Sequence, residues 1–207
     1  MMKLFSALCL FFFTAAASAQ DLAPDALVKK ISNEVIEIIK QDKDIQAGNH
    51  KKVNELVDAK VLPHFDFTRM TALAMGRNWP KANAEQQQVL TDEFRTLLVH
   101  TYSSALSTYK NQVIEFKPLR ASAQDTEVTV KTQVKQAGAE PVSIDYSMEK
   151  TSAAWKVYDV VVGGVSLVTN YRETFNAEVR TGGVDGLIKS LANKNRSLEN
   201  PASAKPK

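Results

Sequence analysis

Residues 155–175 read WKVYDVVVGGVSLVTNYRETF, and the change from strand to helix within this stretch decides the fold. Residues 155–162 are apolar on both faces, which predicts a strand that is central or covered on both sides. Two glycines then allow the backbone to turn sharply. From Ser166 onward the apolar residues recur with helical spacing. In this predicted helix they are Leu167, Tyr171, Phe175 and Val179.

Between about residue 112 and this strand, every second residue tends to be apolar. In three segments apolar and polar side chains alternate, so each segment predicts a strand with one buried and one solvent-exposed face. Their apolar members are Ile114 and Phe116; Val128, Val130, Thr132 and Val134; and Val142, Ile144, Tyr146 and Met148. Together with residues 155–162 they predict a four-stranded antiparallel meander that helices cover on one side.

Further upstream, the apolar spacing of three and four residues predicts amphipathic helices. The longest, about residues 84–109, begins with a predicted capping box of Asn83 and Gln86. The other expected start, cap and stop residues are Pro24, Asn49, Asp66 and Gly76. Helices, then a meander, then helices indicate a single α+β domain over residues 20–195, followed by a polar tail (196–207) that we expect to be disordered.

The N-terminus has the three parts of a secretory signal peptide (residues 1–19). A basic start is followed by an apolar stretch of about ten residues, roughly half the length that a bilayer-spanning helix needs. Small residues at 17–19 predict cleavage after Ala19. The only cysteine, Cys9, lies in the apolar part, so the mature chain is expected to be a soluble, cysteine-free periplasmic protein.

The charges argue against a nucleic-acid partner. The chain has 26 basic and 23 acidic residues, and they are interleaved along the sequence. The histidines, His50, His64 and His100, are not spaced to share a metal ion on a helix face. We therefore expect no metal site and no cofactor.

Ser166 is the one residue whose setting resembles a hydrolase nucleophile. That motif requires G-x-S-x-G, but Leu167 and Val168 follow Ser166, so the second glycine is missing. We predict that Ser166 caps a helix and that the protein has no catalytic residues. The apolar helix and strand faces either fill one another as core or enclose an apolar ligand, and periodicity does not separate these two possibilities.

Two long stretches of the chain, residues 61–106 and 155–175, resemble the MlaC family of periplasmic phospholipid-binding proteins, also called toluene-tolerance proteins. The resemblance covers about residues 27–195. Its carrying features are Leu62-Pro63, Asp66-Phe67, Gly76 with Trp79, the helix from Phe94 to Tyr102, Trp155 to Asp159, Gly164-Val165-Ser166, and Asn170-Tyr171-Arg172 with Phe175. Gly163 departs from the family pattern, where we expect an acidic residue.

The resemblance implies a monomeric phospholipid carrier that helps to maintain outer-membrane lipid asymmetry. Its implied partners are an outer-membrane lipoprotein–porin complex and an inner-membrane ABC transporter with a mammalian-cell-entry domain subunit. The implied architecture is cone-like, with N-terminal helices and the long helix packed on a curved sheet around an internal apolar cavity. The alternatives are a small hydrolase or isomerase of the same cone-like fold, acting on an apolar substrate, and an adaptor without a cavity.

If such a cavity exists, the apolar faces of the long helix, the third strand and the C-terminal helix should line it. The predicted acyl-chain contacts are Leu98, Tyr102, Leu106, Ile144, Tyr146, Met148, Tyr171 and Phe175. Each of them lies on the apolar side of its element, and ordinary core packing is the alternative for each.

The signal peptide prediction is tested by intact-mass analysis of protein isolated from the periplasm. The mature chain should begin at Gln20 and contain no thiol, because cleavage after Ala19 removes Cys9. A mass that retains Cys9, or a lipid-modified N-terminus, would contradict this prediction.

Overall fold

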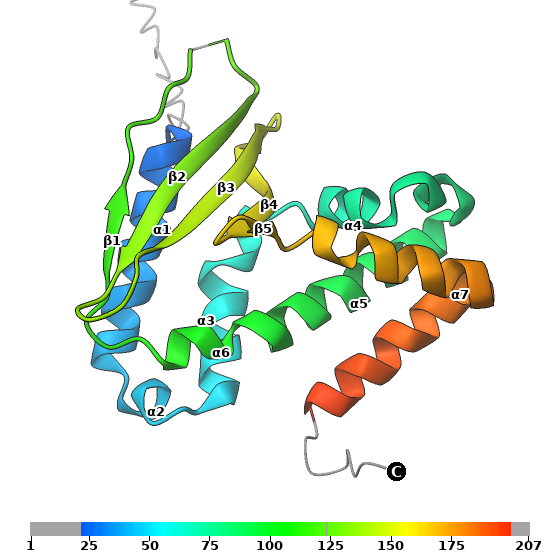
Figure 1. Cartoon of the computed structure of the whole chain (residues 1–207), viewed down its shortest axis with the longest axis horizontal. Helices are drawn as coiled ribbons and strands as arrows, with labels where there is room; N and C mark the ends of the chain where they lie inside the picture. The colour runs from blue at the N-terminus through cyan, green and yellow to red at the C-terminus, as the bar shows by residue number, and fades with distance from the viewer. Residues whose placement is uncertain (1–21, 123, 200–207) are drawn as a thin grey trace, which may run out of the picture.

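A computed structural model of the chain describes residues 22–122 and 124–199 (Figure 1). The predicted signal peptide and residues 200–207 of the predicted tail lie outside these ranges. Residues 196–199 form the last turn of the final helix. The α+β class is confirmed, with helices before and after an antiparallel sheet.

The sheet has five strands in chain order, one more than the sequence predicted. They are β1 (Val113–Phe116), β2 (Glu127–Lys135), β3 (Val142–Lys150), β4 (Trp155–Val162) and β5 (Val165–Ser166). The extra strand arises because Gly163 and Gly164 have φ angles of 57° and 86°. Two successive positive φ angles close a two-residue hairpin, so the chain pairs back on β4 before any helix begins.

The alternation along the strands places their apolar side chains on one face, which we call the inner face. Val130 pairs with Tyr146, and Tyr146 pairs with Val160, so these three side chains share that face. The register shifts between Ser147 and Met148, which marks a bulge in β4. Because a bulge inserts one residue, Val157 and Val160 both contribute to the inner-face core although they are three residues apart.

The described residues also form seven α-helices and three 3₁₀ turns. The α-helices are α1 (Pro24–Gln41), α2 (Lys43–Gln46), α3 (His50–Lys60), α4 (Phe67–Met75), α5 (Ala84–Tyr102), α6 (Ser104–Ser107) and α7 (Arg172–Glu199). The 3₁₀ turns are η1 (Leu62–His64), η2 (Gly76–Lys81) and η3 (Thr169–Tyr171).

The predicted helix boundaries are confirmed where a side chain caps the helix. Asn49 and Asp66 accept hydrogen bonds from the backbone N–H groups of Lys52 and Arg69. Asn83 and Gln86 form the predicted capping box of α5. Gly183 interrupts α7 with φ 69° and ψ −170°, close to the predicted stop. Local side-chain chemistry therefore determines where these helices begin and end.

Two helix predictions need correction. The long helix ends at Tyr102 rather than near residue 109, and α6 follows as a separate short helix. The C-terminal helix begins at Arg172, because Ser166 still belongs to β5 and η3 comes in between.

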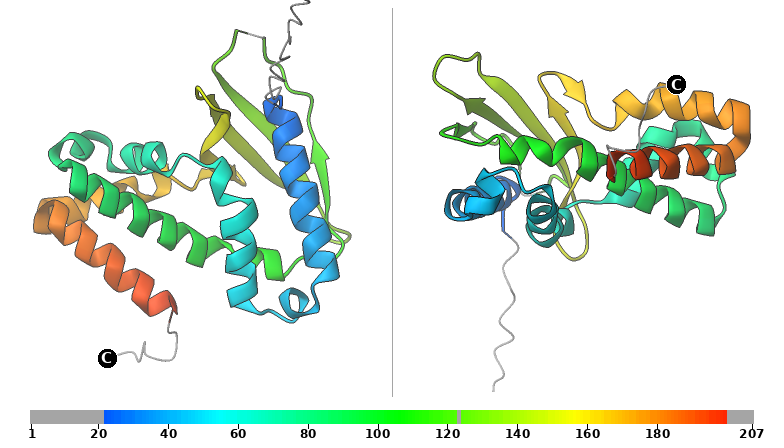
Figure 2. Two further views of the ribbon diagram at one scale, coloured as in Figure 1. Left: turned by 180° about the vertical axis from the view of Figure 1, so that it is seen from behind. Right: turned by 90° about the horizontal axis from the view of Figure 1, so that it is seen from below.

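The apolar side chains form three cores, which also correct the predicted position of the long helix. In the first core, α5 packs against α4 and α7 in a helical layer, rather than on the sheet. In the second, α1 covers the inner face of the sheet, and in the third, α1, α2 and α3 pack together. Figures 1 and 2 show the helical layer on one side of the molecule and the sheet with α1 on the other.

A small hydrogen-bond network stabilises the turn that connects the sheet to the helical layer, between β5 and α7. The Ser166 hydroxyl donates to Asp159 Oδ2 at 2.6 Å and accepts from the Thr169 N–H at 3.0 Å. Asp159 Oδ1 also accepts from the Val168 N–H at 3.2 Å. The prediction that Ser166 caps a helix is wrong, because Ser166 lies in β5 and η3 begins after Val168 without a side-chain cap. Its hydroxyl instead stabilises the turn before η3, where a carboxylate and an amide engage it.

Replacement of these two residues should affect stability unequally. Ser166→Ala should lower the free energy of unfolding by about 1 kcal/mol, the usual net contribution of a hydrogen bond. Asp159→Ala should cost about 2–3 kcal/mol, because it leaves the partners of a charged acceptor unsatisfied. Urea unfolding measures both, and Ser152→Ala in an exposed turn is the control. A loss of lipid transfer in folded Ser166→Ala would instead indicate a catalytic serine.

Candidate functional site

The inner face of the sheet is only partly covered by α1. Several of its apolar side chains are half-buried, although they lie within a sheet that a helix covers. They are Ile114, Phe116, Val128, Val134, Ile144, Tyr146 and Val162. Beneath them, Val130 and Met148 are fully buried against Leu27 and Val28 of α1. The inner face therefore combines a closed floor with a half-open apolar surface.

The coverage decreases toward the end of the sheet that carries the β4–β5 turn. Val142, at the start of β3, is 43% exposed, and Val165, at the start of β5, is 55% exposed. The register places Ile144 opposite Val162, and Val162 opposite Val165, so these residues continue the inner face toward solvent. Exposed large apolar side chains that are contiguous with a half-buried face are typical of a binding surface.

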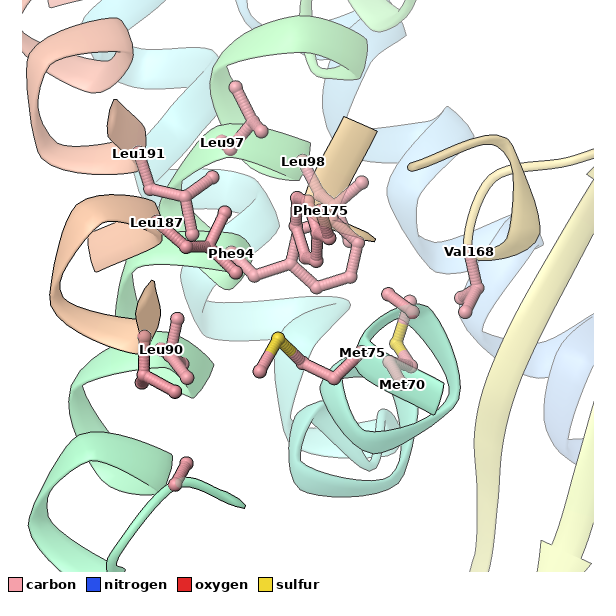
Figure 3. Close-up of a cluster of buried hydrophobic side chains, with 13 residues drawn as sticks. Met70, Met75, Leu90, Phe94, Leu97, Leu98, Val168, Phe175, Leu187 and Leu191 are labelled. Atoms are coloured by element: carbon pink, nitrogen blue, oxygen red, sulfur yellow. The ribbon is translucent and has the colours of Figure 1, made fainter. Parts of the chain in front are cut away.

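The helical layer has the opposite character (Figure 3). Phe94 on α5 and Phe175 on α7 are 0% and 1% exposed, and their rings meet edge to face at 5.1 Å between centroids. Met70 and Met75 of α4 complete the same cluster. These side chains are buried against one another, so this layer is a packed core.

The polar atoms on the inner face are few and are hydrogen-bonded. Thr132 is buried, and its hydroxyl donates to the Ile144 carbonyl at 2.8 Å. Burial raises the pKa of Tyr146, which keeps its phenol neutral, while a hydrogen bond with Thr132 opposes the shift. The inner face thus presents apolar groups and no charge from these residues.

Tyr102 and Tyr171 form a second polar pair, between α5 and η3. Partial burial, followed by the neighbouring Tyr171 hydroxyl, raises the pKa of Tyr102 to about 12. The Tyr171 ring packs edge-on against Phe94 with 5.2 Å between centroids. Because Tyr102 is 36% exposed, this pair lies at the margin of the helical core and within reach of solvent.

The structure separates the eight predicted lipid contacts into three groups. Ile144, Tyr146 and Met148 lie together on the inner face. Leu98, Tyr171 and Phe175 lie in the helical core, and Tyr102 adjoins them through Tyr171. Leu106 packs at the third core. The cause is the packing of α5 onto α7, which brings their apolar faces together and away from the strands.

The predicted internal cavity is not shown within residues 22–122 and 124–199. Two hollows within these ranges are open surface depressions, one beside α2 and one lined by Asp58, Leu62, Pro63, Phe67 and Arg95. Whether the eight residues contact acyl chains therefore stays a prediction.

Several residues of the inner face were not among the predicted acyl-chain contacts. Phe116, Val142, Val162 and Val165 extend this surface, and Ile31 of α1 packs beside it. The two-residue alternation of the strands already contained Phe116 and Val142, and cross-strand register was the missing information.

Two further properties concern the described part of the chain. No three His, Cys, Asp or Glu side chains within residues 22–122 and 124–199 are grouped to hold a metal ion. None of the helices in these ranges has the length and hydropathy that would let it cross a membrane.

The fold and the site together define a class of α+β protein, in which a meander presents a half-covered apolar face beside a separately packed helical core. The family model described as "MlaC protein" matches residues 29–193. The chain therefore belongs to the MlaC protein family, as its sequence features indicated.

Individual relatives agree with this assignment. The intermembrane phospholipid transport system binding protein MlaC of Haemophilus influenzae is 23% identical over 183 residues, covering 87% of this chain and 86% of the relative. The toluene tolerance protein ttg2D of Pseudomonas putida is 24% identical over 185 residues, covering 86% and 85%.

A solved structure is also similar, with a TM-score of 0.80 and 42% sequence identity. It is a phospholipid-binding protein from Ralstonia solanacearum in complex with a phospholipid, and the match covers 86% of this chain and 99% of that chain.

The raised pKa of Tyr102 predicts an alkaline loss of stability. A pKa that is higher in the folded than in the unfolded state stabilises the fold below pH 10, and this stabilisation is lost as the pH rises through about 12. Unfolding free energies measured across this range should therefore fall less steeply for Tyr102→Phe than for the wild type. If an absorbance titration instead shows that Tyr102→Phe removes a phenol that ionises near pH 10, the prediction is wrong.

Proposed function

We propose that this protein carries phospholipid across the periplasm, with the acyl chains held against the inner face of the sheet. The observation that carries the proposal is the half-covered apolar face of a chain that shares 42% identity with a protein solved in complex with a phospholipid. The half-buried Ile144 and Tyr146 are the proposed centre of the contact, and the buried Met148 is its floor.

Physical chemistry explains why such a carrier is needed. Two acyl chains contain on the order of 30 methylene groups, and each costs about 0.8 kcal/mol to expose to water, or roughly 20 kcal/mol or more in total. A phospholipid therefore does not leave a membrane for water at a useful rate. A protein that covers the chains and leaves the polar headgroup in water removes most of this cost.

Room for the chains must come from separation of groups that now touch. Leu27, Val28 and Ile31 of α1 pack on the inner face, so we propose that α1 moves away from the strands when lipid binds. The helical core of α4, α5 and α7 is filled by its own side chains and is proposed to stay intact. In this account Leu98 and Phe175 stabilise the fold, while Tyr102, Tyr171 and Leu106 border the lipid.

The location and partners of the carrier follow from the predicted signal peptide and the family. We propose that cleavage after Ala19 releases a soluble periplasmic monomer. Its proposed partners are the outer-membrane lipoprotein–porin complex and the inner-membrane ABC transporter with its mammalian-cell-entry domain subunit. The Ser166 hydroxyl is held by Asp159 and by the Thr169 N–H, which supports a structural role for this residue.

A bulky side chain on the inner face should compete with lipid. Ile144→Trp should lower the amount of co-purified phospholipid at least about two-fold, while the melting temperature stays within a few degrees, since a half-open face tolerates added volume better than a filled core. Lipid extraction followed by mass spectrometry gives the lipid content, and a thermal scan of the same sample gives the stability. Leu106→Trp, at the border, should have a smaller effect.

Ser143→Trp is the matched control for this experiment. Ser143 is the neighbouring residue of β3 and is exposed on the opposite, polar face, so the same side chain there should leave the lipid content unchanged. Full lipid content in folded Ile144→Trp, or equal loss in Ser143→Trp, would show that the inner face is not the binding surface.

A further inference from the structure

One row of side chains on the inner face crosses all five strands. The strand register pairs its members in the order Phe116, Thr132, Ile144, Val162 and Val165, and we call them the cross-strand row. Neighbouring strands lie about 4.8 Å apart, so the row is roughly 14 Å long between β1 and β4. Ile144, the proposed centre of the lipid contact, lies in its middle. The two ends of the row are therefore the places where the two ends of a bound lipid would lie.

A positive charge lies at the β1 end of the cross-strand row. The Lys29 Nζ of α1 is 6.0 Å from the centre of the Phe116 ring. The preceding residue, Val28, is buried against the inner face, whereas the Lys29 side chain is exposed. Figure 2 (left) shows α1 in front of the strands, with β1 at the edge of the sheet beside it. Lys29 thus lies at the margin of the apolar face, with its ammonium near an apolar ring and open to solvent.

No ion pair within residues 22–122 and 124–199 involves Lys29. The ion pairs of α1 are made by Glu34 and by Glu37. Asp25 lies one helical turn before Lys29 but does not pair with it in these ranges. At 6.0 Å the attraction between an exposed ammonium and an aromatic ring is weak. An anion can therefore replace the ring as the partner of this ammonium at little cost.

The other end of the cross-strand row is apolar and exposed. Val162 is followed by Gly163, Gly164 and Val165, none of which has an ionisable side chain. Val165 is 55% exposed, and covering such a side chain with hydrocarbon is favourable. The row is therefore cationic at one end and apolar at the other. A phospholipid has the matching polarity, because its phosphate lies at one end of the molecule and the methyl groups of its acyl chains lie at the other.

We propose that Lys29 binds the phosphate of the carried phospholipid, and that the acyl chains extend from there across the strands toward the β4–β5 turn. This inference rests on the proposed function for the presence of the chains on the inner face. Lysine binds phosphate as a mobile point charge, which suits a carrier that must release its ligand. The contact is exposed to solvent, so Lys29 should orient the lipid and add modestly to its affinity.

Spin-labelled phospholipids test the orientation of the bound lipid. One lipid carries a nitroxide on its headgroup, and the other carries it near the end of an acyl chain. The headgroup label should broaden the amide NMR signal of Lys29 more than those of Gly163 and Gly164, and the chain-end label should do the reverse. The opposite pattern, or equal broadening at both ends of the row, would overturn the proposal.

Two lipids with identical brominated acyl chains test the contribution of the Lys29 charge. Phosphatidic acid carries a phosphate and diacylglycerol carries none, and quenching of Trp155 in the inner-face core reports the binding of both. A Trp79→Phe background removes the signal of the other tryptophan. Lys29→Gln should weaken phosphatidic acid binding about three-fold at low salt and leave diacylglycerol binding unchanged. Lys29→Arg should retain the wild-type affinities, and the difference between the lipids should disappear at high salt.

Lys30→Gln is the matched control for this titration. Lys30 is the next residue of α1, is exposed and carries the same charge, but it points about 100° around the helix from Lys29. It should bind both lipids as the wild type does. Unchanged phosphatidic acid binding in Lys29→Gln would overturn the proposal, and so would an equal loss in Lys29→Gln and Lys30→Gln, which indicates an effect of net charge alone.

Inorganic phosphate distinguishes a lipid headgroup from a free anion. Excess inorganic phosphate, compared with chloride at the same ionic strength, should not displace phosphatidic acid, because one exposed lysine holds a phosphate only weakly without the chains. Specific displacement would show a site for free phosphate and overturn the assignment to a headgroup. If the wild type binds neither lipid, the proposed function fails and this inference fails with it. If the wild type binds both lipids and Lys29→Gln changes neither affinity, this inference alone fails.

Discussion

The contact between β4 and the segment after η1 joins the helical layer to the sheet. The Asp66 N–H donates to the Val157 carbonyl at 2.8 Å, and Phe65 packs against both the helical core and the inner-face core. Arg69 reinforces the contact, since its guanidinium lies 3.6 Å from the centre of the Tyr158 ring and pairs with Glu127 and Glu149. The arrangement of the whole molecule depends on this contact, because it fixes how the helical layer stands beside the sheet.

The two halves have different physical tasks in this account. The helical core is closed by aromatic and methionine side chains, so it can stabilise the protein whether or not lipid is present. The inner face is closed only at its floor, where Val130 and Met148 meet α1. A carrier needs both properties, because a binding surface that opens to admit acyl chains must be supported by a part that stays folded when the chains leave.

Much of the fold could be predicted because it is encoded locally. Side-chain caps at Asn49, Asp66 and Asn83 mark helix starts, and alternation along β2 and β3 assigns each side chain to a face. The fifth strand was missed since two residues are too few to show a period. The family resemblance, confirmed by the matching family model, added the expectation of phospholipid binding that no local pattern contains.

The candidate site was harder to predict because it depends on which elements meet. Alternation placed Ile144, Tyr146 and Met148 on one face, and the structure confirms this grouping. The apolar stripes of Leu98 and Phe175 fit a sheet or another helix equally well, so periodicity could not assign them to the helical core.

Photo-crosslinking with a phospholipid that carries a diazirine in its acyl chain tests the central claim most directly. After irradiation of the lipid-bound protein, mass spectrometry of peptides identifies the residues that the chain touches. The account predicts crosslinks on β3 and β4, including Ile144 and Tyr146, and on the facing side of α1. Crosslinks confined to the helical core, around Phe94 and Phe175, would contradict it.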